Sequence, residues 1–137
     1  MGILAVLILD THTLVWWVDG SAKLSATAAE VIKPYMRQPD SLLVSSISIW
    51  EITLLSRKGR LQLNRPLHEW LDLVEQLPVI RFVPVDNVVA RLSVELPGEF
   101  HPDPADRMIV ATAITHDAQL LTCDRKILQY QHVKTLW

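Results

Sequence analysis

The stretch ILAVLILDTHTLVWWV, residues 3–18, predicts a buried strand that runs directly into a helix. Residues 3–9 are all apolar and do not alternate with polar residues, a pattern typical of a strand covered on both faces in a parallel sheet. Asp10 follows where this strand ends, and residues 11–18 have the apolar composition expected of a short helix. A strand, an acid and a helix therefore follow one another at this point, and similar units recur along the chain.

Four more apolar runs predict strands, at residues 42–44, 80–85, 119–123 and 133–136. Helical patterns fill the gaps at residues 25–37, 48–58, 66–77, 86–96 and 104–116. Ser25, Asp86 and Asp103 are the expected N-caps, and Gly59 is the expected terminator of the third of the six predicted helices. This alternation predicts an α/β fold with a mainly parallel sheet of about five short strands and right-handed crossovers.

The composition sets limits on the function. A chain of 137 residues that is 50% hydrophobic and 20% charged is expected to form one domain over residues 1–137. The formal net charge of −2 excludes a generally basic nucleic-acid-binding surface. Cys123 is the single cysteine, which excludes an internal disulfide and a cysteine-based zinc site and favours a reducing, cytoplasmic location. The apolar run at residues 3–9 is too short to span a membrane, so no membrane association is expected.

Acidic residues are predicted to gather at one edge of the sheet. In a parallel sheet the strands' carboxyl ends and the following helix starts share an edge, where ligands bind. This placement applies to Asp10, Glu51, Asp103, Asp106 and Asp124. Each acid alone is more often a helix cap, and Ser48 with Glu51 has the spacing of a capping box. As a set, however, they would repel one another unless some were protonated or a cation lay among them. Oxygen donors of this kind favour Mg²⁺ or Mn²⁺.

Four blocks of the sequence together resemble the PIN domain family, and within it the VapC-type toxins. They are LILDTHTLVWW at residues 7–17, LVSSISIWEITLLSRKGRL at 43–61, HPDPADRMIVATAITH at 101–116 and LLTCDRKILQY at 120–130. The resemblance covers nearly the whole chain, in the family's order. One departure is Ala105, where an aromatic residue is frequent in the family.

The resemblance implies a three-layer α/β/α domain and a specific activity. The implied protein is an Mg²⁺- or Mn²⁺-dependent endoribonuclease, the toxin of a toxin–antitoxin pair, which hydrolyses RNA with metal-activated water. It implies an RNA substrate, a small antitoxin partner and a homodimer. Carried over by position, Asp10 and Asp106 would be the principal metal ligands. Glu51 would bind metal directly or through water, and Asp124 would bind a second ion or hold water. These four would also be the catalytic residues. Positions expected to support them are Thr11, Ser48, Asp103 and Thr122.

Basic and aromatic side chains supply further candidates. Contacts to RNA phosphates are expected from Arg57, Lys58, Arg60 and Arg107, although each has a structural alternative in a solvated helix end or an ion pair. Trp16 and Trp17 are adjacent and cannot both face one core, so one of them is expected at a surface. Both, with Trp50 and Trp70, are candidates for dimer or antitoxin contacts, and core packing is an equal alternative for the last two.

Two other classes of function remain open from the sequence. A phosphatase with Asp10 as a covalent nucleophile would need a second aspartate where His12 stands, and trapping of an aspartyl-phosphate would reveal it. A non-catalytic PIN-like binding module would not need all four acids, and failure to bind Mn²⁺ would favour it.

Overall fold

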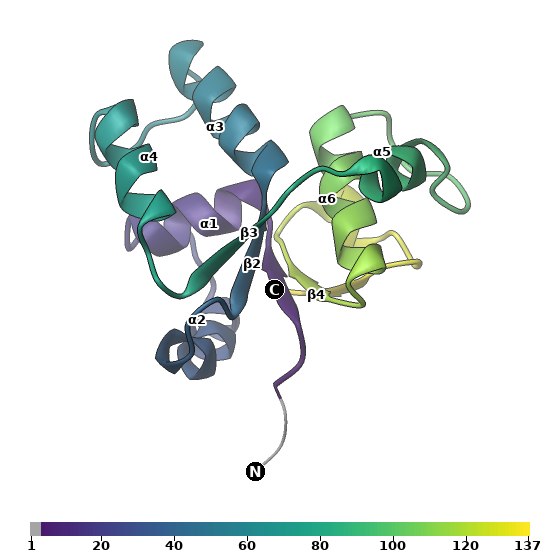
Figure 1. The fold of residues 1–137 in the computed structure, drawn as a ribbon, viewed down its shortest axis with the longest axis horizontal. Helices are drawn as coiled ribbons and strands as arrows, with labels where there is room; N and C mark the ends of the chain where they lie inside the picture. The colour runs from purple at the N-terminus through teal and green to yellow at the C-terminus, as the bar shows by residue number, and fades with distance from the viewer. Residues whose placement is uncertain (1–3) are drawn as a thin grey trace.

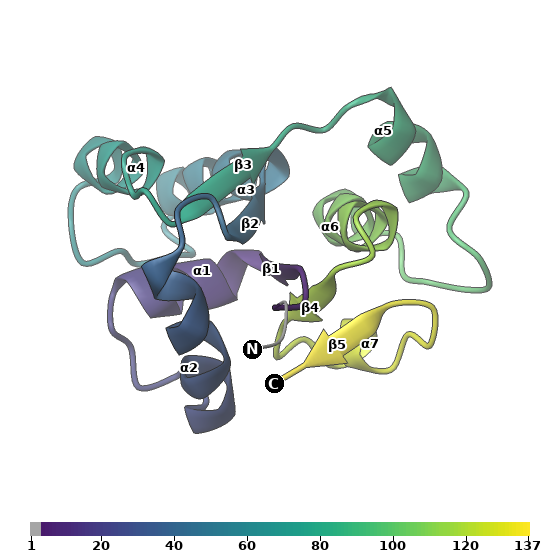
Figure 2. The ribbon, with the colours of Figure 1, turned by 60° about the horizontal axis from the view of Figure 1, so that its bottom comes forward.

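The structure is a computed structural model that describes residues 4–137 (Figure 1). Five strands form one sheet in the order β3-β2-β1-β4-β5, and every pairing is parallel. The order can be followed across Figure 2. The strands are β1 (Leu7–Leu9), β2 (Leu42–Ser45), β3 (Ile80–Val83), β4 (Gln119–Leu121) and β5 (Lys134–Leu136). The predicted α/β fold with a parallel sheet is confirmed. A strand was predicted at residues 3–9, but the observed strand begins only at Leu7. Residue 3 lies outside the described part of the chain.

Helices cover both faces of the sheet, which gives three layers (Figure 1). They are α1 (Thr11–Val18), α2 (Ala26–Ile32), the 3₁₀ turn η1 (Lys33–Arg37), α3 (Ser46–Arg57), α4 (Leu67–Glu75), α5 (Asn87–Val94), α6 (Pro104–Thr115) and α7 (Arg125–Leu128). Side chains of β1 show the division, because Leu7 and Leu9 pack with α1–α4 whereas Ile8 packs with α5–α7. Burial on both faces explains why β1 is continuously apolar. None of the helices between residues 4 and 137 is long and apolar enough to cross a membrane.

Local capping explains most of the helix boundaries. The side chains of Ser25, Asp86 and Asp103 accept backbone N–H groups at the starts of α2, α5 and α6, as predicted. Gly59, with a φ of +70°, follows the last turn of α3 in the left-handed conformation that glycine adopts readily. The predicted start of α3 is wrong. The Ser45 hydroxyl accepts the N–H of Ile47, so the cap lies three residues upstream of the expected capping serine and the helix begins at Ser46.

The tryptophans are placed differently from the expectation. Trp16 and Trp17 are both half-buried against the core on the α1–α4 side, so neither is exposed. Trp70 is fully buried and its indole N–H donates to Asp19 Oδ1 at 2.8 Å, which excludes it from an interface. Trp50 is 54% exposed on α3 and stays a candidate for contact with a partner.

Candidate metal and catalytic site

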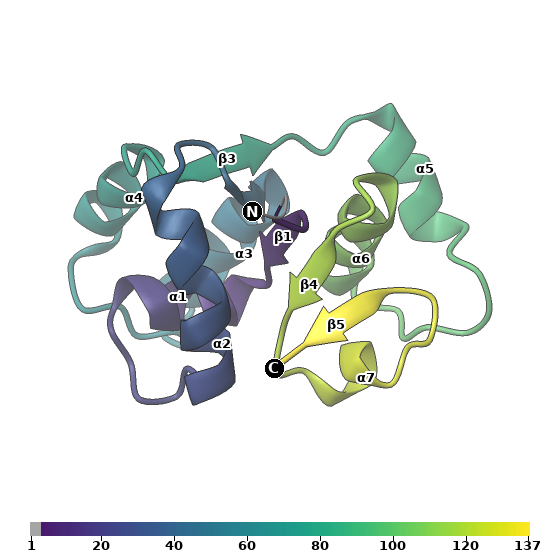
Figure 3. The ribbon, with the colours of Figure 1, turned by 90° about the horizontal axis from the view of Figure 1, so that it is seen from below.

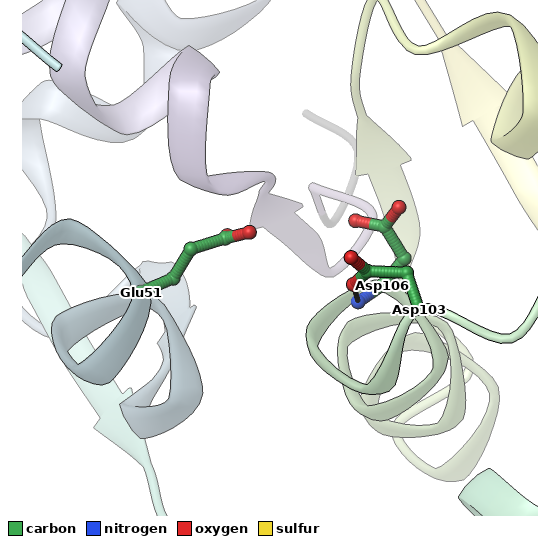
Figure 4. A group of neighbouring side chains, drawn as sticks. All are labelled: Glu51, Asp103 and Asp106. Carbon is green, nitrogen blue, oxygen red and sulfur yellow. Dashed lines mark hydrogen bonds between the residues drawn. The ribbon is translucent and has the colours of Figure 1, made fainter. Parts of the chain in front are cut away.

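The central feature of the site is a group of three carboxylates at the carboxyl edge of the sheet. Glu51 extends from α3 on one side, and Asp103 and Asp106 extend from the start of α6 on the other (Figure 4). One carboxylate oxygen from each of the three lies within 4.8 Å of the other two. The Asp103 side chain accepts the N–H of Asp106 at 3.0 Å, and this cap starts α6 at the sheet edge. Asp103, expected only to support the site, thus also contributes an oxygen to this group.

Asp10 and Asp124 flank the point where β1 and β4 meet. This is the switch point of the sheet, because β1 pairs with β2 on one side and β4 on the other. Asp10 is only 7% exposed, and its carboxylate accepts the Thr11 N–H at 2.8 Å and the Thr122 hydroxyl at 2.6 Å. The same Thr122 hydroxyl accepts the Asp124 N–H at 3.0 Å. Thr122 therefore fixes both acids relative to the end of β4.

Three acids of the site, Asp10, Glu51 and Asp106, have raised pKa values. Burial raises the pKa of Asp106 to about 8, and the charges of Asp10, Asp103, Asp124 and Glu51 add to the effect. Burial also raises the pKa of Asp10 and of Glu51, offset in part by hydrogen bonds from Thr122 and Thr11. A divalent cation would reverse this repulsion, and an all-oxygen donor set suits a hard ion. The residues present thus fit a metal ion.

Two hydroxyls predicted to support the site meet each other. The side chains of Thr11 and Ser48 share a hydrogen bond of 2.9 Å, which joins α1 to α3 next to the acids. Ser48 does not cap α3, so the predicted capping box with Glu51 is wrong. Glu51 is thereby free of a capping role, and its carboxylate faces the other acids.

His101 is a site residue that the sequence interpretation missed. Its Nε2 lies 3.0 Å from Asp106 Oδ2, which is ion-pair distance, although the angle is not that of a hydrogen bond. Both side chains are 17% exposed. The only signal in the sequence was the position of His101 in the HPDPAD stretch, five residues before Asp106.

The basic group lies apart from the carboxylates. Arg57, Lys58 and Arg60 are exposed at the far end of α3, six to nine residues after Glu51. At a rise of about 1.5 Å per residue, Arg57 is roughly 9 Å further along the helix axis than Glu51. None of the three takes part in an ion pair among residues 4–137. Their contact with RNA stays a prediction.

Arg107 has a structural role that was not predicted. Its guanidinium donates hydrogen bonds to the carbonyl oxygens of Ser93, Val94, Phe100 and His101, at 2.7–3.3 Å. These contacts fasten the loop between α5 and α6 onto α6. Arg107 takes part in no ion pair with an acid among residues 4–137, and its contact with RNA stays a prediction.

The variant Arg107→Lys tests this structural role. Lysine keeps the charge but lacks the planar fork that reaches several carbonyls, so we expect the free energy of unfolding to fall by about 1–2 kcal/mol. Urea unfolding would measure it, with affinity for single-stranded RNA measured in parallel. Unchanged stability together with weaker RNA binding would contradict the structural role.

The variant Thr122→Val tests the link between Asp10 and Asp124. Without the hydroxyl, the charged form of Asp10 loses a hydrogen bond, its pKa rises further, and we expect Mn²⁺ affinity at pH 7 to fall roughly tenfold. Calorimetric titration would measure the affinity. Thr122→Ser keeps the hydroxyl and is the matched control, so equal losses in both variants would argue against the hydrogen bond as the cause.

Comparison with known proteins supports a family assignment. Residues 7–133 match the family model described as PIN domain. Ribonuclease VapC22 from Mycobacterium tuberculosis is 35% identical to this chain over 136 residues, which cover 98% of this chain and 100% of that protein.

Solved structures share the fold at low sequence identity. FitAcB from Neisseria gonorrhoeae superposes with a TM-score of 0.68 at 20% identity, over 96% of each chain. DNA-bound VapBC from Salmonella typhimurium superposes with a TM-score of 0.70 at 17% identity, over 96% of this chain and 97% of that one. With the family match and the curated relative, these findings show that the chain belongs to the PIN domain family, with the VapC-type proteins.

Proposed function

We propose that this chain is an Mg²⁺- or Mn²⁺-dependent endoribonuclease and the toxin of a VapBC-type toxin–antitoxin pair. The observation that carries the proposal is the convergence of Glu51, Asp103 and Asp106, with the pKa of Asp106 raised to about 8. A group of acids so arranged is unfavourable for the metal-free fold, which is typical of a functional site. The relative with 35% identity is a ribonuclease, which supports RNA as the substrate.

The ligand roles follow from the positions of the acids. Asp10 and Asp106 would be the principal ligands, because both are largely withdrawn from solvent at the carboxyl edge of the sheet. Asp124 would serve a second ion or hold water, and Asp103 would add an oxygen beside Glu51. When bound, the ion supplies positive charge that offsets the carboxylates and the substrate phosphate, and it acidifies water.

Glu51 is the residue best suited to orient the attacking water. It is half-buried, its pKa is raised mainly by burial, and its carboxylate faces Asp106 across the site (Figure 4). A carboxylate with a raised pKa is a better proton acceptor near neutral pH than an ordinary one. If water attacks phosphorus and the P–O3′ bond breaks, the 3′ oxygen leaves as a hydroxyl and the phosphate stays on the 5′ carbon of the next nucleotide; the ribose 2′-hydroxyl is not needed.

Partners and location are part of the proposal. The Salmonella typhimurium structure is of DNA-bound VapBC, which supports a small antitoxin as partner of this chain. We also propose a homodimer, for which exposed Trp50 is a candidate contact. The single cysteine, Cys123, supports a reducing, cytoplasmic location.

Mapping of RNA 5′ ends after brief induction in a bacterium tests the proposal. We expect new 5′-phosphate ends with the wild-type protein and none with Asp10→Asn, which keeps the size of the side chain but lacks the charge that holds metal. Asp72→Asn, at an exposed position on α4, is the matched control and should cut like the wild type. Identical maps for wild type and Asp10→Asn would contradict the nuclease function.

A further inference from the structure

A cavity of about 470 Å³ lies beside the carboxylate group. Its lining residues come from the loop between α5 and α6, from α7 and from the segment that follows α7. The backbone of these parts can be found in Figure 3. We call it the side pocket; its walls include Phe100, His101, Lys126, Tyr130 and His132. The volume falls within the range of about 300–1,000 Å³ that is usual for pockets that bind small molecules.

The side pocket is continuous with the catalytic edge of the sheet through two residues. His101 lines the pocket, and its Nε2 lies 3.0 Å from Asp106 Oδ2. Lys126 also lines it, and the Lys126 N–H donates to Asp124 Oδ1 at 2.8 Å. The side pocket and the acids at the sheet edge therefore adjoin each other.

Aromatic rings form one wall of the side pocket. Phe100 is half-buried, and its ring centroid lies 4.7 Å from that of Tyr130 and 4.5 Å from that of His101. Tyr130 is held in place because its hydroxyl donates to the carbonyl oxygen of Pro97 at 2.5 Å. His132 is exposed, with its ring centroid 5.3 Å from that of Tyr130. Tyr130 is buried, so the exposed imidazole of His132 is the ring of this wall that is most open for stacking.

Charged and amide groups form the rest of the lining. Lys126 is exposed and takes part in no ion pair among residues 4–137. The amides of Gln129 and Gln131 can donate and accept hydrogen bonds, and Glu99 can accept them. Aromatic faces, an unpaired cation and amide groups are the combination that proteins use to bind an unstacked nucleotide of single-stranded RNA.

We infer that the side pocket binds the nucleotide next to the scissile phosphate of a single-stranded RNA, with its base against the aromatic wall and its phosphate near Lys126. The inference rests on the proposed nuclease function and adds a subsite to it. A bound nucleotide here would hold the adjoining phosphodiester over Asp106 and Asp124, so the pocket would contribute to the choice of cleavage site. A free mononucleotide has the same chemistry, and the experiment below separates it from RNA.

The experiment uses a fluorescently labelled single-stranded hexaribonucleotide and six derivatives, each with one abasic position. Affinities are measured by anisotropy in Ca²⁺, and cleavage of the same RNAs is measured separately in Mg²⁺. On the wild-type protein we expect one abasic position to weaken binding roughly tenfold, the usual effect of losing one stacked base. Adenosine monophosphate should compete only weakly, because it lacks the neighbouring phosphate.

Two pairs of variants locate the effect. His132→Ala and Lys126→Gln change exposed residues of the side pocket, and we expect each to weaken binding of the intact RNA. In His132→Ala, the abasic position that weakens binding to the wild type should no longer weaken it. His68→Ala and Lys33→Gln make the same chemical changes at exposed positions on α4 and η1, and they should bind like the wild type.

Each other outcome overturns the inference in a recognisable way. Equal affinity for all abasic RNAs, with cleavage intact, removes the subsite and leaves the nuclease function standing. If adenosine monophosphate binds as tightly as the hexamer, the pocket binds free nucleotides and not RNA. If the protein neither binds nor cuts the RNA, both the proposed subsite and the proposed nuclease function are wrong.

Discussion

Asp106→Asn is expected to lower the rate of RNA cleavage by at least about 1,000-fold, because removing a ligand charge forfeits several kcal/mol of electrostatic stabilisation. The same variant is expected to make the metal-free protein more stable. Asp106 is largely buried among four other acids, and its pKa of about 8 shows that its charge is unfavourable there. Asparagine removes that charge at nearly constant volume.

The gain in the free energy of unfolding should be about 1–3 kcal/mol at pH 7 in the presence of a chelator. Cleavage of a defined RNA and urea unfolding of the same preparations measure the two effects. Asp72→Asn removes a charge from an exposed site on α4 and should change neither. Unchanged cleavage would remove Asp106 from the active site. A loss of stability would mean that its contact with His101 stabilises the ionised form.

The fold was predictable from the sequence because its signals are local. A strand such as Leu7–Leu9 is buried on both faces, and its continuous run of apolar residues indicates that burial directly. Caps such as Ser25 and Asp103 are equally local, since each bonds a backbone N–H three residues away. The gathering of acids at one edge followed from topology alone, before any side chain was placed.

The errors concern side chains whose partners are distant in the sequence. Ser48 had the spacing of a cap, but its hydroxyl bonds Thr11, 37 residues away. Arg107 was expected to contact RNA phosphates, and its role in the fold was missed because it binds backbone carbonyls, which every residue carries and no sequence pattern marks. Trp16 and Trp17 both reach one core because helices and loops on that side surround them. Such outcomes depend on tertiary packing.

The stability of the metal-free protein is expected to fall as the pH rises from about 4 to about 8. In the unfolded chain Asp106 titrates near its ordinary pKa of 3.8, whereas in the folded protein its pKa is about 8. The folded state therefore binds this proton more tightly, so the stabilisation is complete below the lower value and is lost as the pH passes the higher one. Burial shifts Asp10 and Glu51 in the same direction.

A bound cation should reverse this trend, because it favours the ionised acids that the metal-free fold disfavours. At a concentration 100 times its dissociation constant, Mn²⁺ should add about 2.7 kcal/mol to the free energy of unfolding at pH 8. The gain should be far smaller at pH 5, where protons compete for the same oxygens. Urea unfolding at pH 5, 6.5 and 8, with chelator or with Mn²⁺, measures both effects.

In Asp106→Asn the stability of the metal-free protein should depend less on pH, and the gain in stability from Mn²⁺ should be smaller. Metal-free stability that rises over this range would instead show that the acids are ionised and paired in the fold, and the site would then not need a cation.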